Sequence, residues 1–202
     1  DLLHTGNLAR ARQLFEQVQS RGLPVEYLVN NAGYGVPGRF LSSDWRTHAD
    51  FLQVMVTAVA ELTHRFLPGM EQAGRGRILN VASLAGLVPA SAGHTLYGAA
   101  KAFVIRFSES LALEVASRGV HVTALCPGFT YSEFHDVNHM RARVSQLPGW
   151  LWQDADTVAR LGVDAVAPFT VSCERSNTTP APTHQENACA SESSPAAATA
   201  PA

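Results

Sequence analysis

The stretch from Ile78 to Lys101, ILNVASLAGLVPASAGHTLYGAAK, joins a predicted buried strand to the start of a predicted helix. Ser83 stands at the end of the apolar run. Fourteen residues later Tyr97 opens the sequence Tyr-Gly-Ala-Ala-Lys, which places Lys101 four residues after it. Because residues i and i+4 share one face of a helix, the two side chains are expected to lie next to each other. We therefore interpret the remaining chain as a scaffold for these residues, followed by a tail.

The composition predicts one globular domain. The chain has 202 residues, 46% hydrophobic and 16% charged, which is enough to form a sizeable core. Its formal net charge of -2 gives no reason to expect binding to nucleic acid or to a membrane surface. No apolar run approaches the roughly 18 residues of a membrane span. Three scattered cysteines, Cys126, Cys173 and Cys189, argue against a disulfide framework and indicate a reducing compartment, the cytoplasm.

Hydrophobic spacing along the chain alternates between helix and strand. Helices are expected over about 6–20, 44–70, 95–117 and 154–161, and strands over 25–29, 77–82 and 120–126. This alternation predicts a parallel α/β sheet with helices covering both faces. Ligands of such sheets bind at the carboxyl ends of the strands, where Asn30, Ser83 and Pro127 stand.

The pair of Tyr97 and Lys101 permits proton transfer. An ammonium group beside a phenol stabilises the phenolate and lowers a pKa that starts near 10. Ser83 can hydrogen-bond the same reacting oxygen, an arrangement suited to interconverting a carbonyl and an alcohol. A separate hydride carrier is then required. Tyr-x-x-x-Lys alone is a weak signal, because an ordinary Tyr and Lys on a helix surface give the same pattern.

The combination of motifs is more specific. Asn-Asn-Ala-Gly follows the first strand, Ser83 the second and Pro127-Gly128 the third, with the Tyr97 motif between the last two. From about residue 1 to 134 the chain thereby resembles the short-chain dehydrogenase/reductase (SDR) family. The resemblance implies a three-layer Rossmann-type fold and an oxidoreductase that uses NAD or NADP.

The resemblance also implies a role for each matching residue. Tyr97 would be the general acid/base, Lys101 would lower its pKa and hold the nicotinamide ribose, and Ser83 would orient the substrate carbonyl. Further cofactor contacts are implied for Asp1, Asn30, Ala32 and Gly33 near the adenosine, and for Pro127, Gly128 and Ser132 near the nicotinamide. The partners implied are a small carbonyl or alcohol substrate and a second copy of the chain, since the family dimerises through its two long helices.

Three departures from the family pattern qualify this expectation. A glycine-rich, phosphate-binding turn is absent, so the first strands would lie upstream of Asp1 and the sheet would be incomplete. Met55 stands where the family often has a catalytic Asn. No last core strand is visible after Leu161. We expect a partial Rossmann domain over 1–165 and a disordered, low-complexity tail over 172–202.

Two other functions remain open. A non-catalytic fragment, acting as a binding or dimerisation module on the same scaffold, would explain Met55 and the absent glycine turn. A metal hydrolase has only His135 and His139 in its favour, and a metal site is not expected. The choice between NAD and NADP and the identity of the substrate cannot be read from the chain.

Overall fold

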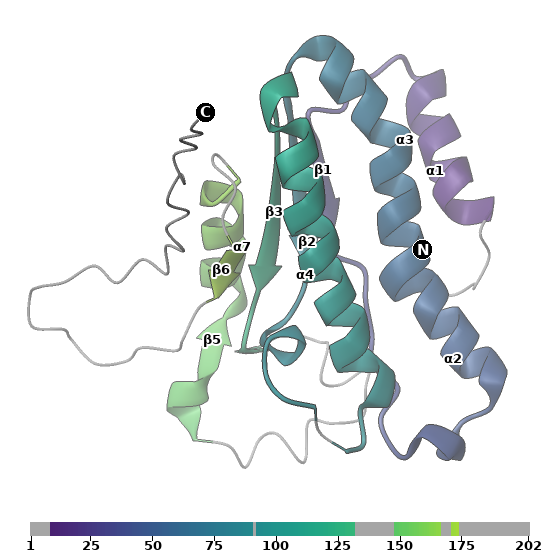
Figure 1. Cartoon of the computed structure of the whole chain (residues 1–202), viewed down its shortest axis with the longest axis vertical. Helices are drawn as coiled ribbons and strands as arrows, with labels where there is room; N and C mark the ends of the chain where they lie inside the picture. The colour runs from purple at the N-terminus through teal and green to yellow at the C-terminus, as the bar shows by residue number, and fades with distance from the viewer. Residues whose placement is uncertain (1–8, 91, 132–147, 167–170, 174–202) are drawn as a thin grey trace, which may run out of the picture.

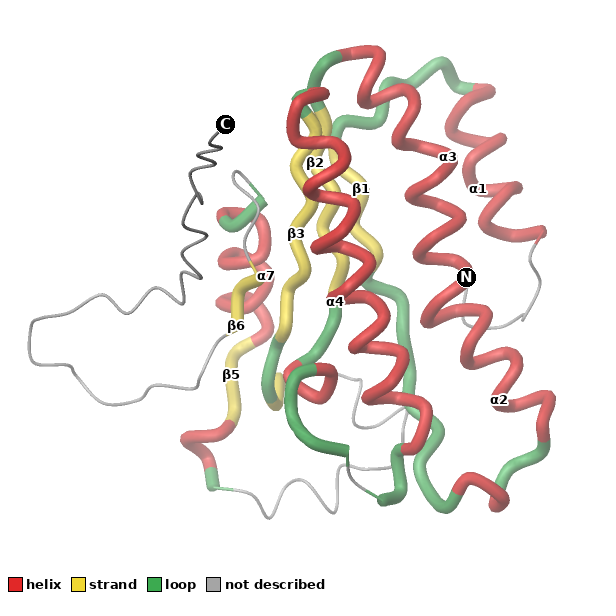
Figure 2. Tube along the Cα trace, in the orientation of Figure 1, coloured by secondary structure: helices red, strands yellow, loops and turns green. Residues whose placement is uncertain are grey.

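The computed structural model describes residues 9–90, 92–131, 148–166 and 171–173, and it contains alternating helices and strands (Figures 1 and 2). The helices are α1 (Ala9–Ser20), α2 (Trp45–Leu52), a π-helical turn (Gln53–Thr57), α3 (Ala58–Ala73), α4 (Thr95–Val115) and α7 (Ala155–Asp164). The strands are β1 (Tyr27–Asn30), β2 (Gly76–Val81), β3 (Val120–Cys126), β4 (Phe129–Tyr131), β5 (Trp152–Asp154) and β6 (Val171–Cys173). Short 3-10 helices span Phe40–Ser42, Leu84–Gly86, Ala116–Arg118 and Gly149–Leu151.

The main sheet is parallel, as the sequence predicts. Its strand order is β1-β2-β3-β6, and Asn30 of β1 lies opposite Asn80 of β2. The strand β6 corrects the expectation that no core strand follows Leu161: Val171–Cys173 pairs in parallel with Ala124–Cys126 of β3. A three-residue strand gives too short an apolar pattern to stand out from flanking sequence. From residue 174 onward the expected tail lies outside the described residues.

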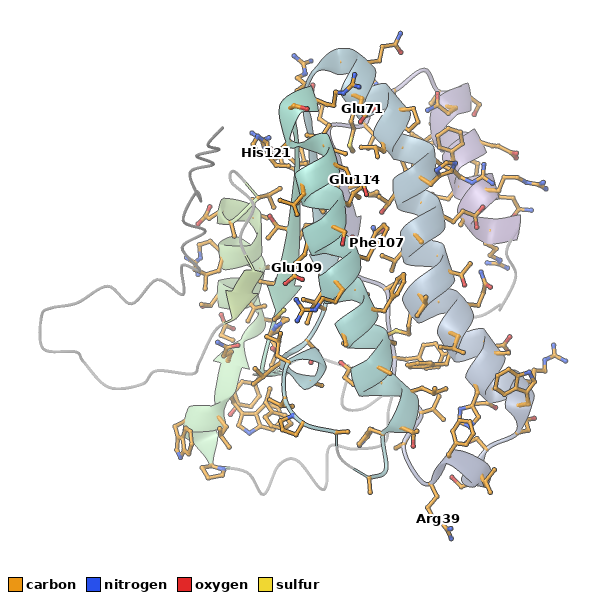
Figure 3. All side chains as sticks on the ribbon, in the orientation of Figure 1. Arg39, Glu71, Phe107, Glu109, Glu114 and His121 are labelled. Carbon is orange, nitrogen blue, oxygen red and sulfur yellow. The ribbon has the colours of Figure 1, made fainter. Side chains whose placement is uncertain are left out.

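The helices α3 and α4 cover one face of the sheet (Figure 1). The core between them contains Ile78, Val122 and Phe66, and Figure 3 shows Phe107 extending from α4 toward α3. Successive strand residues point to opposite faces, so Leu79 and Leu125 lie on the other side. They pack there against Val158 of α7 and against Val166, which follows the end of this helix.

Helices lie on both faces, as the sequence predicts, but the described residues cover the face of α7 only in part. On β1, at the edge of the sheet, Tyr27 is 61% exposed and Val29 is 53% exposed. The helix α1 lies beside α3 rather than beneath β1 (Figure 1). Phe15 of α1 meets Phe66 of α3 edge-on, with ring centroids 5.1 Å apart. The apolar stripe of α1 is therefore buried against a helix instead of against the sheet.

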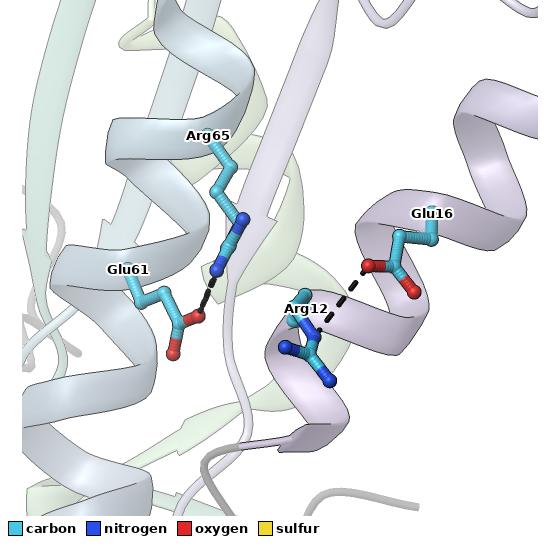
Figure 4. A network of polar contacts seen from close by, with 4 residues as sticks. All are labelled: Arg12, Glu16, Glu61 and Arg65. Atoms are coloured by element: carbon cyan, nitrogen blue, oxygen red, sulfur yellow. Dashed lines mark hydrogen bonds and ion pairs between the residues drawn. The ribbon is translucent and has the colours of Figure 1, made fainter.

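Ion pairs flank the contact of α1 with α3. Arg12 pairs with Glu16 along α1 at 3.5 Å, and Arg65 pairs with Glu61 along α3 at 2.8 Å (Figure 4). The exposed Arg12–Glu16 pair contributes little, about 0.3–0.5 kcal/mol, and the Arg65–Glu61 pair is partly buried. Each pair joins residues of one helix, whereas the aromatic contact and the burial of Ala11 join α1 to α3 directly.

The helical stretch from Trp45 to Ala73 is continuous but wound unevenly. Asp44 caps its start by accepting a hydrogen bond from the Thr47 amide at 2.9 Å. The turn Gln53–Thr57 is π-helical. Pro68 lies inside α3 and does not end it. The helix ends at Gly74, whose φ of +64° is left-handed and favours glycine.

Candidate active site

Ser83 lies directly after β2 and caps the 3-10 turn Leu84–Gly86. Its hydroxyl accepts a hydrogen bond from the Ala85 amide at 3.2 Å. The turn sits against α4 so closely that a Cβ on Gly86 would lie 2.7 Å from the backbone nitrogen of Ala102. Glycine at residue 86 therefore lets the Ser83 turn approach the segment of α4 that carries Lys101.

Tyr97 lies in the first turn of α4 and is half-buried. Its burial raises the pKa of the phenol, and a side-chain hydrogen bond with Ser83 opposes that rise. The structure thus brings the Ser83 hydroxyl and the phenol together from two elements. At neutral pH the phenol is protonated.

Lys101 is 6% exposed and lies one helical turn after Tyr97. Its Nζ donates a hydrogen bond to the Val81 carbonyl at 2.7 Å and stands 5.8 Å from the centroid of the Tyr97 ring. Burial lowers the pKa of the ammonium to about 8. The side chain is therefore anchored to the end of β2, next to the phenol.

Two effects act on the pKa of Tyr97: burial raises it, and the hydrogen bond with Ser83 lowers it. The Lys101 ammonium, with a pKa lowered by burial to about 8, is present beside the phenol at neutral pH. The expectation that Lys101 lowers the pKa of Tyr97 stays a prediction.

Asn30 belongs to a buried polar network. Its Nδ2 donates to Thr63 Oγ1 at 3.2 Å and to Asn80 Oδ1 at 2.8 Å. Asn80 in turn donates to Ser108 Oγ at 2.9 Å, and Ser108 donates to the Val104 carbonyl at 2.7 Å. The side chain of Asn30 thus ties β1 to β2, α3 and α4. Sequence reasoning missed Thr63 and Ser108, whose small hydroxyl side chains on long helices give no distinctive pattern.

The residues after β1 and β3 stand at the same end of the sheet as Ser83. Ala32 is exposed and Gly33 is partly buried, with the Met55 sulfur 3.0 Å from where a Gly33 Cβ would be. The Pro127 carbonyl accepts the Leu84 amide at 2.9 Å, which joins the ends of β3 and β2. Gly128 is partly buried. The other two implied cofactor contacts, Asp1 and Ser132, lie outside the described residues, as do His135 and His139.

A small hollow lies beside Tyr97. Its volume is about 230 Å³, open solvent included. The hollow is lined by Val36, Gly38, Phe40, His48, Phe51, Thr95, Leu96 and Tyr97. Met55 packs nearby with Phe51 and Ala100 in a cluster that also takes in the Tyr97 ring. The described residues contain no cluster of three or more potential metal ligands. In the same part of the chain, every helix is too short or too polar to cross a membrane.

A comparison with known families identifies the family of this chain. Residues 4–141 match the model of the short chain dehydrogenase family, and the chain belongs to that family. It is 41% identical over 105 residues to the 3-oxoacyl-acyl-carrier-protein reductase FabG of Vibrio cholerae, covering 52% of this chain and 43% of the relative. It is 40% identical over 115 residues to the sulfoacetaldehyde reductase of Chromohalobacter salexigens, covering 54% and 44%. The chain thus spans somewhat less than half the length of these two relatives.

Solved structures give the same result. A short-chain dehydrogenase from Sphingobium yanoikuyae, in complex with NADPH, superimposes with a TM-score of 0.72 at 27% identity. That likeness covers 82% of this chain and 64% of the other. A bulky-bulky ketone specific alcohol dehydrogenase from Comamonas testosteroni gives a TM-score of 0.64 at 29% identity, covering 85% and 62%. The Rossmann-type fold expected from the sequence is thereby confirmed.

Proposed function

We propose that this chain carries the catalytic part of an oxidoreductase that interconverts a carbonyl and an alcohol by hydride transfer. The observation that supports this most is the convergence of Ser83 and Tyr97 in one hydrogen bond, with the Lys101 ammonium anchored beside them. A phenol and a hydroxyl meeting at one point can both donate to the same substrate oxygen. The whole protein's substrate is a small carbonyl compound or the corresponding alcohol.

The proposed cofactor is NAD or NADP, since the similar Sphingobium protein binds NADPH. A nicotinamide supplies the hydride when bound. The residues fit such a group: Lys101 uses one of its three N–H donors on Val81, which leaves two for hydroxyl groups of a ribose. Ala32, Gly33, Pro127 and Gly128 would hold the cofactor through backbone at the carboxyl ends of β1 and β3. The side-chain amide of Asn30, which is bonded to Thr63 and Asn80, would hold the start of the segment that contains Ala32 and Gly33.

The proton step is assigned to Tyr97. Because burial keeps its phenol protonated at neutral pH, Tyr97 is ready to donate a proton to the oxygen of a carbonyl being reduced. The Tyr97 O–H bond breaks and the new alcohol O–H bond forms, while Ser83 donates a hydrogen bond that holds the same oxygen. The reverse oxidation requires the phenolate and should therefore be favoured by higher pH.

A non-catalytic module is the second candidate, and Met55 is the observation in its favour. Its thioether cannot donate a hydrogen bond, and it packs with Phe51 and Ala100 in an apolar cluster next to Tyr97.

We also propose a homo-oligomer for the whole protein, formed through α3 and α4. The α4 residues Phe103 and Leu113 are 38% and 81% exposed, which would suit burial in such an interface.

The replacement Tyr97→Phe tests the catalytic proposal in the whole protein that contains this chain. Loss of the proton donor should lower kcat for NADPH-dependent ketone reduction at least about 100-fold. The control is Gln13→Ala, because Gln13 is exposed on α1 and its replacement should leave kcat unchanged. Equal activity of the Tyr97 variant and the unmodified protein would contradict the assignment. No turnover by the unmodified protein with either cofactor would favour the non-catalytic module.

A further inference from the structure

Met55 is a buried side chain to which the proposed reaction assigns no role. It lies in the π-helical turn Gln53–Thr57 and is 2% exposed. Its thioether reaches the segment after β1, because a Cβ built on Gly33 would lie 3.0 Å from the Met55 sulfur and 3.4 Å from its methyl carbon. Glycine at residue 33 therefore leaves the space that the end of the Met55 side chain fills.

The segment after β1 makes a second contact with the same stretch of helix. Tyr34, the residue after Gly33, meets Phe51 of α2 edge-on, with ring centroids 5.6 Å apart. Phe51 is 1% exposed and belongs to the same buried cluster as Met55. Two consecutive residues after β1 thus pack against neighbouring buried side chains of α2 and the π-helical turn.

The buried cluster that contains Met55 extends to α4. Its third buried member is Ala100, which is 3% exposed and immediately precedes Lys101. The ring of Tyr97 packs against this cluster. The π-helical turn itself lies against α4. The cluster therefore joins the segment at Gly33 to the first two turns of α4, which carry Tyr97 and Lys101.

We propose that Met55 is a positioning residue that couples the segment at Gly33 to the ring of Tyr97. Close-packed interiors transmit small displacements, because a side chain that shifts must move its neighbours. The unbranched Met55 side chain is adaptable, but at 2% exposure it can shift only against other side chains. The inference rests on the proposed function in taking Gly33 as a cofactor contact. The bound cofactor would then influence, through Met55, where the proton donor lies.

A Met55 that only fills volume would behave differently. A change at Gly33 would then affect Tyr97 to the same extent with or without the thioether. The replacement Gly33→Ala separates the two cases, since its added methyl would lie 3.0 Å from the Met55 sulfur, closer than ordinary van der Waals contact. Removing the thioether by Met55→Ala makes room for that methyl and should break the link.

The direct test is NMR of the protein labelled with ¹³C in its tyrosine rings, which needs no catalytic turnover. Gly33→Ala should shift the Tyr97 ring signals when Met55 is present, and should leave them unchanged in the Met55→Ala background. Tyr34, next to the altered residue, should shift in both backgrounds. Gly69→Ala is the matched control that should shift neither ring, because Gly69 is exposed on α3 and an added Cβ would meet nothing within 4 Å. Equal shifts of Tyr97 in both backgrounds, or none in either, would overturn the proposal.

Kinetics give a second measurement in the whole protein that contains this chain. Gly33→Ala should lower kcat for NADPH-dependent ketone reduction about tenfold with Met55 present, and less than twofold in the Met55→Ala background. Its effect on KM for NADPH arises at Gly33 itself and should be equal in both backgrounds. An equal fall in kcat in both would contradict the coupling.

Two further outcomes are separable. Should Met55→Ala fail to fold, Met55→Val provides the same comparison in both measurements, because its shorter side chain also withdraws from Gly33. No turnover by the unmodified protein, with the NMR coupling between Gly33 and Tyr97 intact, would contradict the proposed function and leave the coupling standing. Turnover without the coupling would contradict the role of Met55 alone.

Discussion

The two faces of the parallel sheet differ in how completely they are covered. On the face of α3 and α4, Ile78 and Val122 have no exposed surface, and the polar network of Asn80 lies in the same layer. On the opposite face α7 protects Leu79 and Leu125, while Tyr27 and Val29 of β1 remain exposed. The residues proposed to be catalytic stand at the strand ends beside the covered face, with Lys101 of α4 bonded to the end of β2. The comparison indicates that the two faces of the sheet are stabilised to different degrees.

The largest expected effect concerns cofactor binding. We expect the 202-residue chain alone to show no binding of NADPH below millimolar concentration, because its described residues hold no glycine-rich turn that opens a helix. Relative to micromolar binding this is about a thousandfold, or roughly 4 kcal/mol. Fluorescence titration of NADPH measures it, with Lys101→Ala as a control that should change nothing further. Micromolar binding would contradict the expectation that a glycine-rich turn is needed to hold the cofactor.

The buried network should be the most sensitive part of the covered face. Asn80→Ala removes one hydrogen bond from the Asn30 amide and one from the Ser108 hydroxyl, leaving only Thr63 and the Val104 carbonyl as their partners, and should lower the free energy of unfolding by about 3 kcal/mol. Thr63→Val is the graded control, since Asn30 keeps its bond to Asn80, and should cost about 1 kcal/mol. Urea unfolding at constant m-value measures both. Equal urea midpoints for the two variants would show that Asn80 contributes no more to stability than Thr63 does.

Lys101 should make stability depend on pH. Its folded-state pKa of about 8 lies below the ordinary value of 10.5, so the unfolded chain binds more protons between these values. Stability should therefore rise as pH increases through that window and be lowest below pH 8, by at most about 3 kcal/mol. Lys101→Met should abolish this rise in unfolding free energy, measured against the unmodified chain at pH 7.5 and 10.5. An undiminished rise in the variant would assign it to other groups.

The smallest effect is expected on the uncovered face. Val29→Thr on β1 changes an exposed position and should alter the free energy of unfolding by less than about 0.5 kcal/mol. Val29→Lys should additionally raise solubility, because charge on an edge strand opposes pairing between chains. Light scattering during concentration measures the second effect. A loss of stability similar to that of Asn80→Ala would mean that β1 is covered on this face.

The sequence predicted the elements that are long enough to show a clear apolar pattern. Val120–Cys126 is a strand with the predicted bounds, and α4 begins at Thr95 as expected. The coverage of β1 was not predictable, because the apolar stripe of α1 shows that the helix needs a partner without saying which one. Phe15 finds Phe66 on α3. The π-helical turn at Gln53–Thr57 was also missed, since one wide turn barely changes an apolar stripe.

At the candidate site, the sequence predicted which side chains are present but not how they are arranged. Ser83, Tyr97 and Lys101 do come together, yet the order of their pKa values depends on burial, which the residue types do not reveal. Asn30 was assigned by position, while its partners Thr63 and Asn80 lie 33 and 50 residues away in the chain. Gly86 could not be singled out among 15 glycines before its contact with α4 was known.

The π-helical turn has a consequence for insertions and deletions. A wide turn accommodates one residue more than an α-helical turn, so removing a residue from 53–57 would let α2 and α3 join as a regular helix. Everything before the deletion would then rotate by about 100° relative to α3. His48 and Phe51 would leave the hollow, while Met70 and the end of α3 stayed in place. The length of this segment, rather than any one of its side chains, thus determines how α2 is rotated relative to α3, and with it which α2 side chains line the hollow.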